Sequence, residues 1–395
     1  MKTYFSLIFV LFCLSARTQP VIPQKGEGSK FFLNCANMYF EVDSARGARI
    51  TSFKLDDNEL MYVNFNNPNA KDMAGSTFWP SPQSVWGWPP AVNLDSKPYR
   101  TAIRENKIVF TGNTDTKSML RFYKTISANV IDTSIIIDYC IKNEKAAIQK
   151  WAPWEITRVI NSGLTVFSKG SGNVTGDMAA RTQTISGYVW YDQDATLGQA
   201  GAKFFCDGKG WLAHVVDGKM LFIKKFEDVA VGKAAPNEAE VEVYTAGDQS
   251  YTELENQGIY ANIASKDSVT WRVKWFARQL PASVEASVGS TSLINYIEAV
   301  LKREAPLTGT SVANKVNARI YPNPAENLLT IETGLEVGKN ATIKIFDLQG
   351  RILFASTLTQ SKTRISIEHL QQGFYIYDVS QGNEILSKGQ LLIRH

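Results

Sequence analysis

The sequence predicts an all-β protein that consists of a large body followed by a small β domain. Short runs rich in valine, isoleucine, threonine and aromatic residues recur between turn signals over residues 29–280. Near the C-terminus, Ile343, Ile345, Ile365 and Ile367 alternate with polar neighbours, as residues of half-buried strands do. No stretch of the body keeps a helical period over any length. These observations favour sandwich or barrel folds over helical or α/β folds.

The body, residues 29–280, is expected to form one β domain because no linker interrupts it. Turns rich in aspartate, glycine and lysine, such as 207–210 and 217–219, separate its candidate strands. These strands are Tyr39–Val42, Ile108–Thr111, Ser134–Ile141, Trp211–Val216, Met220–Lys225, Glu240–Thr245 and Val269–Phe276. Many short strands separated by regular turns predict a sandwich or a barrel.

The composition changes after Pro281, where the body ends. Residues 281–314 are predicted to be a linker that contains one short helix, over Asn295–Arg303, and the segment Pro306–Ser311. The segment Pro306–Ser311 leads into the tail. We therefore expect the second domain to begin near residue 315.

The tail, residues 315–395, is predicted to be a small immunoglobulin-like β-sandwich. Tyr321–Pro324 is expected at a strand end or turn, since proline donates no hydrogen bond to a sheet. Leu348–Gly350 is expected to be a hairpin turn, and Phe374–Val379 a strand bounded by glycines. About seven short strands in this length are typical of a sandwich. The simplest alternative function is an ordinary binding module.

Residues 1–18 are expected to be a secretory signal peptide. Lys2 precedes an apolar run, Tyr4–Leu14, that is too short to span a bilayer, and small or polar residues follow it. We expect cleavage between Ala16 and Gln19, and no transmembrane segment in the rest of the chain. The protein is therefore predicted to leave the cytoplasm.

The composition excludes several classes of function. With 42 basic and 38 acidic residues the net charge is +4, and no basic block occurs, so nucleic acid is not an expected partner. Only three histidines occur, too few for a histidine-rich metal site. We expect neither a metal nor another cofactor. Cys35, Cys140 and Cys206 follow the signal peptide, and their spacing favours no disulfide pair.

A segment rich in tryptophan and proline, Gly75–Pro90, is the first candidate for a ligand site. Prolines at this density predict a rigid loop rather than a regular strand or helix. Trp79, Trp86 and Trp88 offer wide apolar faces on which the C–H faces of a sugar stack, and Gln83 is expected to bind a sugar hydroxyl. The alternative is a loop that packs its own aromatic side chains over the sandwich edge.

Two further segments carry carboxylates. Lys150–Val159 interleaves Trp154 and Glu155 with basic residues, which suits a polyol site, although a structural ion pair between Glu155 and Arg158 is an equal alternative. In the segment Tyr251–Gly258, Glu253 and Glu255 point to one face if the segment is a strand. Two carboxylates on one face suit an acid/base pair or a cation site. The alternative is that this face is solvated.

The tail resembles the C-terminal sorting domain of the type IX secretion system. Ile320–Pro324, Ile343–Arg351 and Leu370–Ile376 carry its three motifs in the family's order. The resemblance implies that the tail's partner is the type IX machinery. It also implies secretion through the periplasm of a Gram-negative bacterium to the cell surface or the medium.

The body resembles galactose-mutarotase-like domains over residues 31–280. Gly47–Phe53 is similar to the start of these domains, and Leu254–Gln257 is similar to the motif that carries the catalytic glutamate of aldose 1-epimerases. The resemblance implies a galactose-mutarotase-like β-supersandwich, a carbohydrate ligand, and Glu255 as the base that deprotonates the anomeric hydroxyl. A carboxylate serves as a base near neutral pH when burial raises its pKa.

One departure from the family puts turnover in doubt. The histidine that supplies the acid stands before proline and an aromatic residue, whereas here the matching triplet is Ala152–Trp154. The acid role is therefore open to Glu155 or His214, or to Lys224 or Tyr191. Trp154 and Lys224 are also expected to bind the sugar. Three hypotheses remain: an epimerase-like enzyme, a glycan-binding module without turnover, and a structural surface protein.

Overall fold

The computed structural model describes residues 20–67, 73–193, 201–302, 318–333, 340–347, 351–381 and 384–394. The chain divides into two compact units, 1–312 and 313–395. The predicted signal peptide, the segment Pro306–Ser311 and the turn Leu348–Gly350 lie outside the described residues. No helix in the described ranges is long and apolar enough to cross a membrane.

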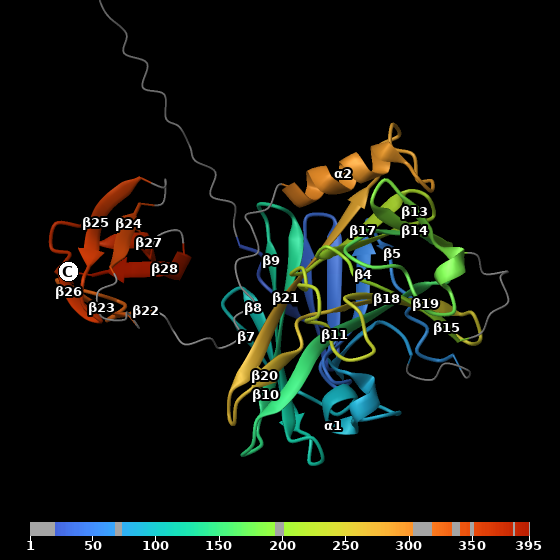
Figure 1. The fold of residues 1–395 in the computed structure, drawn as a ribbon, viewed down its shortest axis with the longest axis horizontal. Coiled ribbons are helices and arrows are strands. Elements are labelled where there is room, and N and C mark those ends of the chain that lie inside the picture. The colour runs from blue at the N-terminus through green and yellow to red at the C-terminus, as the bar shows by residue number, and fades with distance from the viewer. Residues whose placement is uncertain are drawn as a thin grey trace, which may run out of the picture. The chain divides into compact units, whose positions relative to one another are not determined.

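The first unit contains two large antiparallel sheets, as predicted from its many short strands (Figure 1). Within the described residues, the eleven-stranded sheet runs in the order β1 (Gln24–Lys25), β2 (Lys30–Cys35), β3 (Met38–Asp43), β4 (Arg49–Leu55), β6 (Ser76–Ser81), β11 (Gln149–Ile160), β19 (Tyr251–Gln257), β18 (Val241–Thr245) and β15 (Ala202–Cys206). Two short strands complete it: β5 (Asn58–Glu59) pairs with β4, and β20 (Ala261–Ile263) pairs with β11.

The second sheet of this unit has ten strands among the described residues. Their order is β13 (Gln183–Ile185), β14 (Tyr188–Gln193), β12 (Gly163–Ser168), β16 (Trp211–Val216), β17 (Met220–Lys225), β21 (Ser268–Gln279), β10 (Ser134–Asn143), β9 (Leu120–Asn129), β8 (Lys107–Thr114) and β7 (Arg100–Arg104). The two sheets face each other across the main hydrophobic core, which makes the body a β-sandwich.

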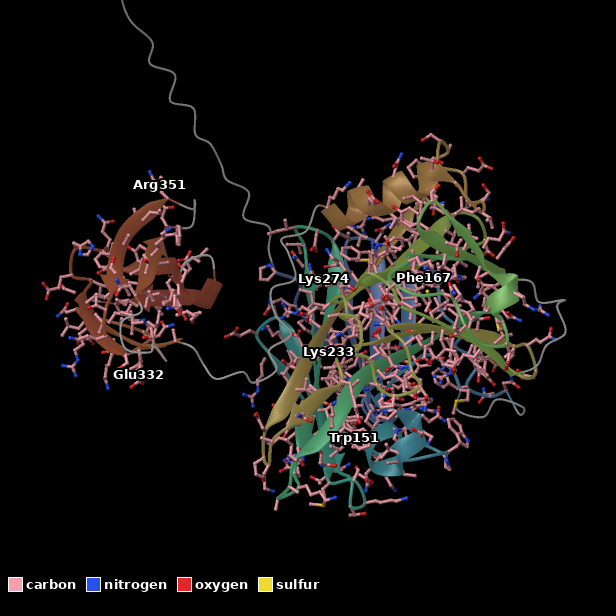
Figure 2. The ribbon with its side chains drawn as sticks, viewed as in Figure 1. Trp151, Phe167, Lys233, Lys274, Glu332 and Arg351 are labelled. Atoms are coloured by element: carbon pink, nitrogen blue, oxygen red, sulfur yellow. The ribbon has the colours of Figure 1, made fainter. Side chains whose placement is uncertain are left out.

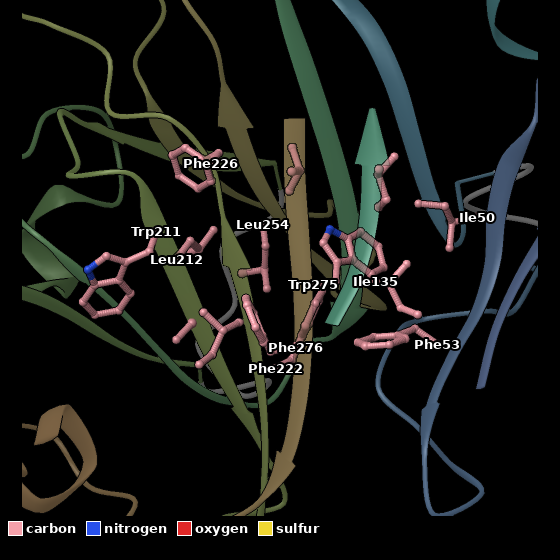
Figure 3. Packing of buried hydrophobic residues seen from close by; sticks show 14 of the residues in the cluster. Ile50, Phe53, Ile135, Trp211, Leu212, Phe222, Phe226, Leu254, Trp275 and Phe276 are labelled. Carbon is pink, nitrogen blue, oxygen red and sulfur yellow. The ribbon is translucent and has the colours of Figure 1, made fainter. Parts of the chain in front are cut away.

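Aromatic side chains from both sheets meet at the centre of this core. Phe53 of β4 lies 5.3 Å from Phe222 of β17 and 5.3 Å from Trp275 of β21, measured between ring centroids. Figure 3 shows these three side chains converging from their separate strands. Figure 2 shows Phe167 inside the same unit, among the side chains that fill it. Large aromatic rings bury much apolar area, so this contact is a main source of the body's stability.

Four short helical segments occur among the described residues of this unit. They are the 3-10 turns η1 (Gln83–Val85) and η2 (Ala179–Arg181), and the α-helices α1 (Val92–Asp95) and α2 (Thr291–Lys302). Helix α2 begins at Thr291 rather than at the predicted Asn295, because the Ser290 side chain accepts the Leu293 backbone N–H and caps the helix earlier. Its apolar face packs into the main core, and Tyr188 of β14 donates a hydrogen bond to Glu298.

The second unit is a small β-sandwich with its own core, as the alternating isoleucines predicted. One sheet contains β22 (Ala318–Tyr321), β23 (Leu328–Thr333) and β26 (Lys362–Ser366), and the other contains β25 (Ile352–Leu358), β24 (Ala341–Phe346), β27 (Gly373–Gln381) and β28 (Glu384–Ile393). Ile343, Ile345 and Ile367 are completely buried. Of the charged residues labelled in Figure 2, Arg351 is largely exposed and Glu332 is half-buried.

The cysteines that the structure describes, Cys35, Cys140 and Cys206, are free thiols. Burial raises the pKa of each of them, most of all that of Cys206, to about 11. A thiol with a raised pKa carries little of the reactive thiolate form near neutral pH. These side chains are therefore part of the packing rather than candidates for chemistry.

Candidate functional site

Side-chain alternation in β11 and β19 sorts their polar residues onto two faces of the eleven-stranded sheet. Thr157 and Glu155 of β11 both contact Lys224 of the ten-stranded sheet, so they point into the sandwich. Trp154 and Arg158, one residue away from them, therefore point to the opposite face, which we call the outer face. Strands β11, β19, β18 and β15 are neighbours in this order within the sheet, and Figure 1 shows them in the same part of the unit.

Glu253 and Glu255 of β19 share the outer face, as the period-two spacing predicted. Arg158 of β11 is the cross-strand partner of Glu253, and its guanidinium donates to that carboxylate at 2.8 Å. Glu242 of β18 is the cross-strand partner of Glu255. The charged residues of three neighbouring strands thus lie together on one face.

A pocket of about 440 Å³ opens on this face, and we call it the outer pocket. Its lining is aromatic and charged, and comes from β6, β11, β15, β18 and β19 and the segments beside them. The lining residues are Met73, Trp79, Gln83, Trp88, Trp154, Gly201, Lys203, Tyr244, Tyr251, Glu253 and Glu255. Five of the predicted site residues, Trp79, Gln83, Trp88, Trp154 and Glu255, are therefore brought together.

Glu255 is completely buried, yet half of its carboxylate is free. Its Oε2 accepts hydrogen bonds from the Trp154 indole N–H and the Lys203 ammonium, both at 2.9 Å. Its Oε1 has no hydrogen-bond partner among the described residues. Burial raises the pKa of Glu255 to about 7, although the Lys203 ammonium opposes this rise. Buried polar atoms without a partner are rare in proteins, so this carboxylate oxygen is a candidate acceptor for a hydrogen bond from a bound molecule.

Lys203 joins two carboxylates. Its Nζ lies 2.5 Å from Glu242 Oε2 and 2.9 Å from Glu255 Oε2. Burial alone would lower the pKa of Lys203, but Glu255 and Glu242 raise it, so the ammonium form persists. The pKa of the Glu242 carboxyl is also raised, because this side chain is buried. Gln257 donates a further hydrogen bond to Glu242 at 2.8 Å, which fixes the carboxyl in place.

The tryptophan- and proline-rich segment forms one wall of the outer pocket. Trp79 is at the centre of an aromatic cluster, with its ring centroid 5.9 Å from Trp86, 5.9 Å from Trp88 and 5.6 Å from Trp154, all in edge-to-face contact. The Gln83 backbone N–H donates to Glu238 at 3.0 Å and so ties the loop to the segment before β18. Such contacts hold the loop in one conformation.

The prediction that all of this segment is a loop is wrong for its first part. Ser76–Ser81 forms β6, and Pro80 lies opposite Pro153 of β11. On its other side, β6 pairs with β4 only at Ser76, so the missing N–H of Pro80 interrupts no ladder there. Proline is tolerated in a strand where no hydrogen bond is required of it.

The remaining predicted residues lie elsewhere. Glu155 is completely buried inside the sandwich, where it accepts hydrogen bonds from the Tyr139 hydroxyl at 2.9 Å and the Trp275 indole at 3.1 Å, and its Oε2 lies 3.2 Å from the Lys224 ammonium. The predicted alternative of an ion pair between Glu155 and Arg158 is wrong, because the two side chains point to opposite faces. Glu155 and Lys224 are therefore not brought together with Glu255 in the outer pocket.

His214 also lies inside the sandwich. Its Nδ1 is 3.1 Å from the Thr165 hydroxyl, and burial lowers its pKa to about 3. The imidazole is therefore neutral near pH 7. The hydroxyl oxygens of Tyr191 (β14) and Thr245 lie 3.4 Å apart, also inside the sandwich. Trp86 lines a neighbouring hollow of about 350 Å³ together with Trp151 rather than the outer pocket.

Several pocket residues were missed by sequence reasoning. Tyr251 had a signal, because it precedes Glu253 and Glu255 at the same spacing of two. Lys203 and Tyr244 each alternate with buried apolar residues in β15 and β18, which marks them as outer-face residues. Met73 had no signal, because only the folded chain brings it to the pocket. In the described residues no cluster of His, Cys, Asp and Glu is arranged to hold a metal ion.

Comparison with known families identifies the tail. Residues 319–394 match the family described as the secretion system C-terminal sorting domain. This match covers the second unit and not the body. The chain therefore carries a sorting domain of this kind, which indicates export. No curated protein matches the sequence.

Solved structures similar to this chain include putative aldose 1-epimerases. The one from Klebsiella pneumoniae is 9% identical, with 72% of this chain and 88% of that chain covered and a TM-score of 0.46. The one from Escherichia coli K12 is 10% identical, with coverages of 63% and 98% and a TM-score of 0.43. A galactose mutarotase-like protein from Lactobacillus casei is 8% identical, with coverages of 63% and 100% and a TM-score of 0.45. The chemistry of the outer pocket therefore rests on its own residues.

Proposed function

We propose that the body of this exported protein binds a sugar in the outer pocket, where Glu255 accepts a hydrogen bond from a sugar hydroxyl. The observation that carries the proposal is the free, buried Oε1 of Glu255 beside aromatic walls. A buried acceptor without a donor costs about 1–3 kcal/mol, and more when it is charged. A sugar hydroxyl supplies that donor, whereas an apolar ligand would leave Oε1 without a hydrogen bond.

Stacking is assigned to Trp88 rather than to all four predicted tryptophans. Trp88 is 59% exposed and lines the pocket, whereas Trp79 and Trp154 are 3% and 2% exposed. Trp79 holds Trp88 by edge-to-face contact, and Trp154 holds Glu255 by its indole N–H. The pocket volume of about 440 Å³ lies at the lower end of the range of small-molecule sites and suits one sugar ring.

Aldose epimerisation is the second candidate, favoured by the Glu255 pKa of about 7. A carboxylate with this pKa is a competent base near neutral pH. Oε1 would take the proton of the anomeric hydroxyl, a C=O bond would form at C1, and the bond from C1 to the ring oxygen would break. The ring oxygen must then gain a proton. Among the described lining residues, the cation that could give this proton is the Lys203 ammonium. Its raised pKa makes it a weak acid, so we propose sugar binding ahead of epimerisation.

We further propose that residues 315–395 direct export by the type IX machinery to the cell surface or the medium, after a signal peptide at 1–18 is removed. The sorting-domain match over 319–394 supports this route. Deleting 315–395 should trap the protein in the periplasm, as measured by fractionation of the cells. Unchanged surface or extracellular protein after the deletion would contradict the assignment of the route.

The binding proposal is tested by tryptophan emission of the purified chain during titration with neutral monosaccharides. All nine tryptophans lie between positions 79 and 275, so the emission reports on the body alone. We expect a saturable change with at least one sugar, absent in Glu255→Gln and retained in the control Glu105→Gln, which alters an exposed turn residue. NMR of the bound sugar's anomers then separates binding from epimerisation. Equal responses of Glu255→Gln and wild type would contradict the proposed site.

A further inference from the structure

The charged groups of the outer pocket are already paired with one another. The carboxyl groups of Glu242, Glu253 and Glu255 stand on the outer face beside two cations, Arg158 and Lys203. Arg158 is engaged by Glu253 at 2.8 Å, and Lys203 by Glu242 at 2.5 Å and by Glu255 at 2.9 Å. Both cations are thus held by protein carboxylates before any ligand arrives.

We propose that the outer pocket selects sugars by charge: it accepts neutral sugars and rejects anionic ones such as uronic acids and sugar phosphates. This inference rests on the proposed function, because it assumes that the pocket binds a sugar. The free Oε1 of Glu255 is the specificity-determining atom, since it attracts a hydroxyl proton and repels a carboxylate or a phosphate. Like charges brought together in a desolvated site weaken binding by more than tenfold.

Both cations of the pocket also pack against aromatic rings of the lining. The Lys203 ammonium lies 5.1 Å from the centroid of the Trp154 ring, and the Arg158 guanidinium lies 5.6 Å from that of Trp79. Each cation therefore also covers an aromatic face. An anionic ligand would have to draw one of them away from both its carboxylate and its ring. Breaking a buried ion pair leaves an uncompensated charge, which is strongly unfavourable.

A neutral sugar meets no such obstacle. Its hydroxyls donate to Oε1 of Glu255 and accept from donors at the rim, such as the Gln83 side chain and the hydroxyl of Tyr244, which both line the pocket. Trp88 remains exposed to receive the ring. The existing ion pairs stay in place. The pocket therefore gains hydrogen bonds without losing any of its own.

The charge of Glu255, and with it the selection, depends on pH. The charged and titratable groups that surround this carboxylate come from each neighbouring element: Lys203 from β15, Glu242 and Tyr244 from β18, Glu253 from β19, Arg158 from β11, and Glu238 from the segment before β18. With a pKa of about 7, Glu255 is ionised at pH 8.5 and protonated at pH 5.5. Rejection of anions should therefore be strong at pH 8.5 and weaker at pH 5.5.

Calorimetric titration of the full chain with sugars that differ only at C6 tests the inference. The pairs are glucose and glucuronate, galactose and galacturonate, and mannose and mannuronate. At pH 8.5 we expect the acid of the best-bound pair to bind at least about tenfold more weakly than the neutral sugar. An acid that binds as tightly as its neutral partner, or more tightly, overturns the charge selection while leaving sugar binding intact. Binding of neither member in any pair overturns the proposed function itself.

The assignment to Glu255 has a separate test. In Glu255→Gln the preference for the neutral sugar should fall several-fold, whereas Glu105→Gln should retain it. Because Glu255→Gln removes a buried group, the wild-type chain is also measured at pH 5.5, where the preference should narrow in the same way without a mutation. A preference that is unchanged by both the variant and the pH would show that Glu255 is not the selecting group.

Discussion

Glu155 and Glu255 are completely buried carboxylates on adjacent strands of one sheet, but only Glu255 lines the outer pocket. Both oxygens of Glu155 have protein partners inside the sandwich, from Tyr139, Trp275 and Lys224. Glu255, on the outer face, has partners for Oε2 alone. A fully partnered carboxylate stabilises the fold, and a half-partnered one is available to bind.

The ammonium partners of the two carboxylates differ in the same way. Lys224 is completely enclosed, and burial lowers its pKa. Lys203 keeps 21% of its side chain exposed at the pocket, and two carboxylates raise its pKa. The inner cluster is therefore closed and the outer cluster open. This difference predicts that changes inside will alter stability, and that changes outside will alter binding.

The largest effect is expected from Glu155→Gln. Removing the charge leaves Lys224 buried without its partner, which costs about 3–5 kcal/mol of the free energy of unfolding. Urea unfolding followed by tryptophan emission measures this loss in the body. The double variant Glu155→Gln, Lys224→Met should recover part of it, because no buried charge remains. A loss below about 1 kcal/mol in the single variant would contradict the closed-cluster description.

Glu255→Gln should show the opposite pattern. The amide oxygen still accepts from Trp154, so the free energy of unfolding should change less than in Glu155→Gln. Sugar affinity should fall by about 1.5–3 kcal/mol, the range for a hydrogen bond to a charged group. Calorimetry of both variants side by side gives the comparison directly. Equal losses of stability in the two variants would remove the distinction between the inner and the outer carboxylate.

The sequence allowed the architecture and part of the pocket to be predicted. The alternation of Tyr251, Glu253 and Glu255 places the carboxylates on one face in any fold in which this segment is a strand. The tryptophan- and proline-rich segment marks a rigid wall because its composition suits few other structures. The first inference holds because side chains alternate strictly between the two faces of a strand. The second holds only for the part of the segment after Ser81, because Ser76–Ser81 is strand β6.

The position of Glu155 could not be predicted, and the reason is physical. Strand β11 is buried on both faces, from Trp151 to Val159, so its hydrophobicity shows no alternation that reveals which face is inward. Trp154 and Glu155 are equally buried but point in opposite directions. The direction of His214 could not be predicted for the same reason, because strand β16 is also buried along its whole length. Only the pairing with neighbouring strands resolves the direction.

A smaller effect is expected from Trp88→Ala. Losing the exposed ring should weaken sugar binding by about 1 kcal/mol, and leave the free energy of unfolding within about 0.5 kcal/mol of wild type. Ile148→Ala, which truncates another exposed apolar side chain away from the pocket, is the control and should change neither quantity. Unaltered affinity in Trp88→Ala would place the stacking surface elsewhere and leave the outer cluster to act through hydrogen bonds alone.

The smallest effect is expected from an ion pair that is neither enclosed nor beside the pocket. Arg272 of β21 donates to both carboxylate oxygens of Asp138 of β10, at 2.6 and 2.9 Å, with 46% and 33% of the two side chains exposed. Water screens such a pair, so Arg272→Ala should cost only about 0.2–1 kcal/mol of the free energy of unfolding. That loss should shrink further in about 1 M salt, where screening acts within about 3 Å. A loss as large as that of Glu155→Gln would mean that paired charge alone, and not enclosure, sets the stability of these sheets.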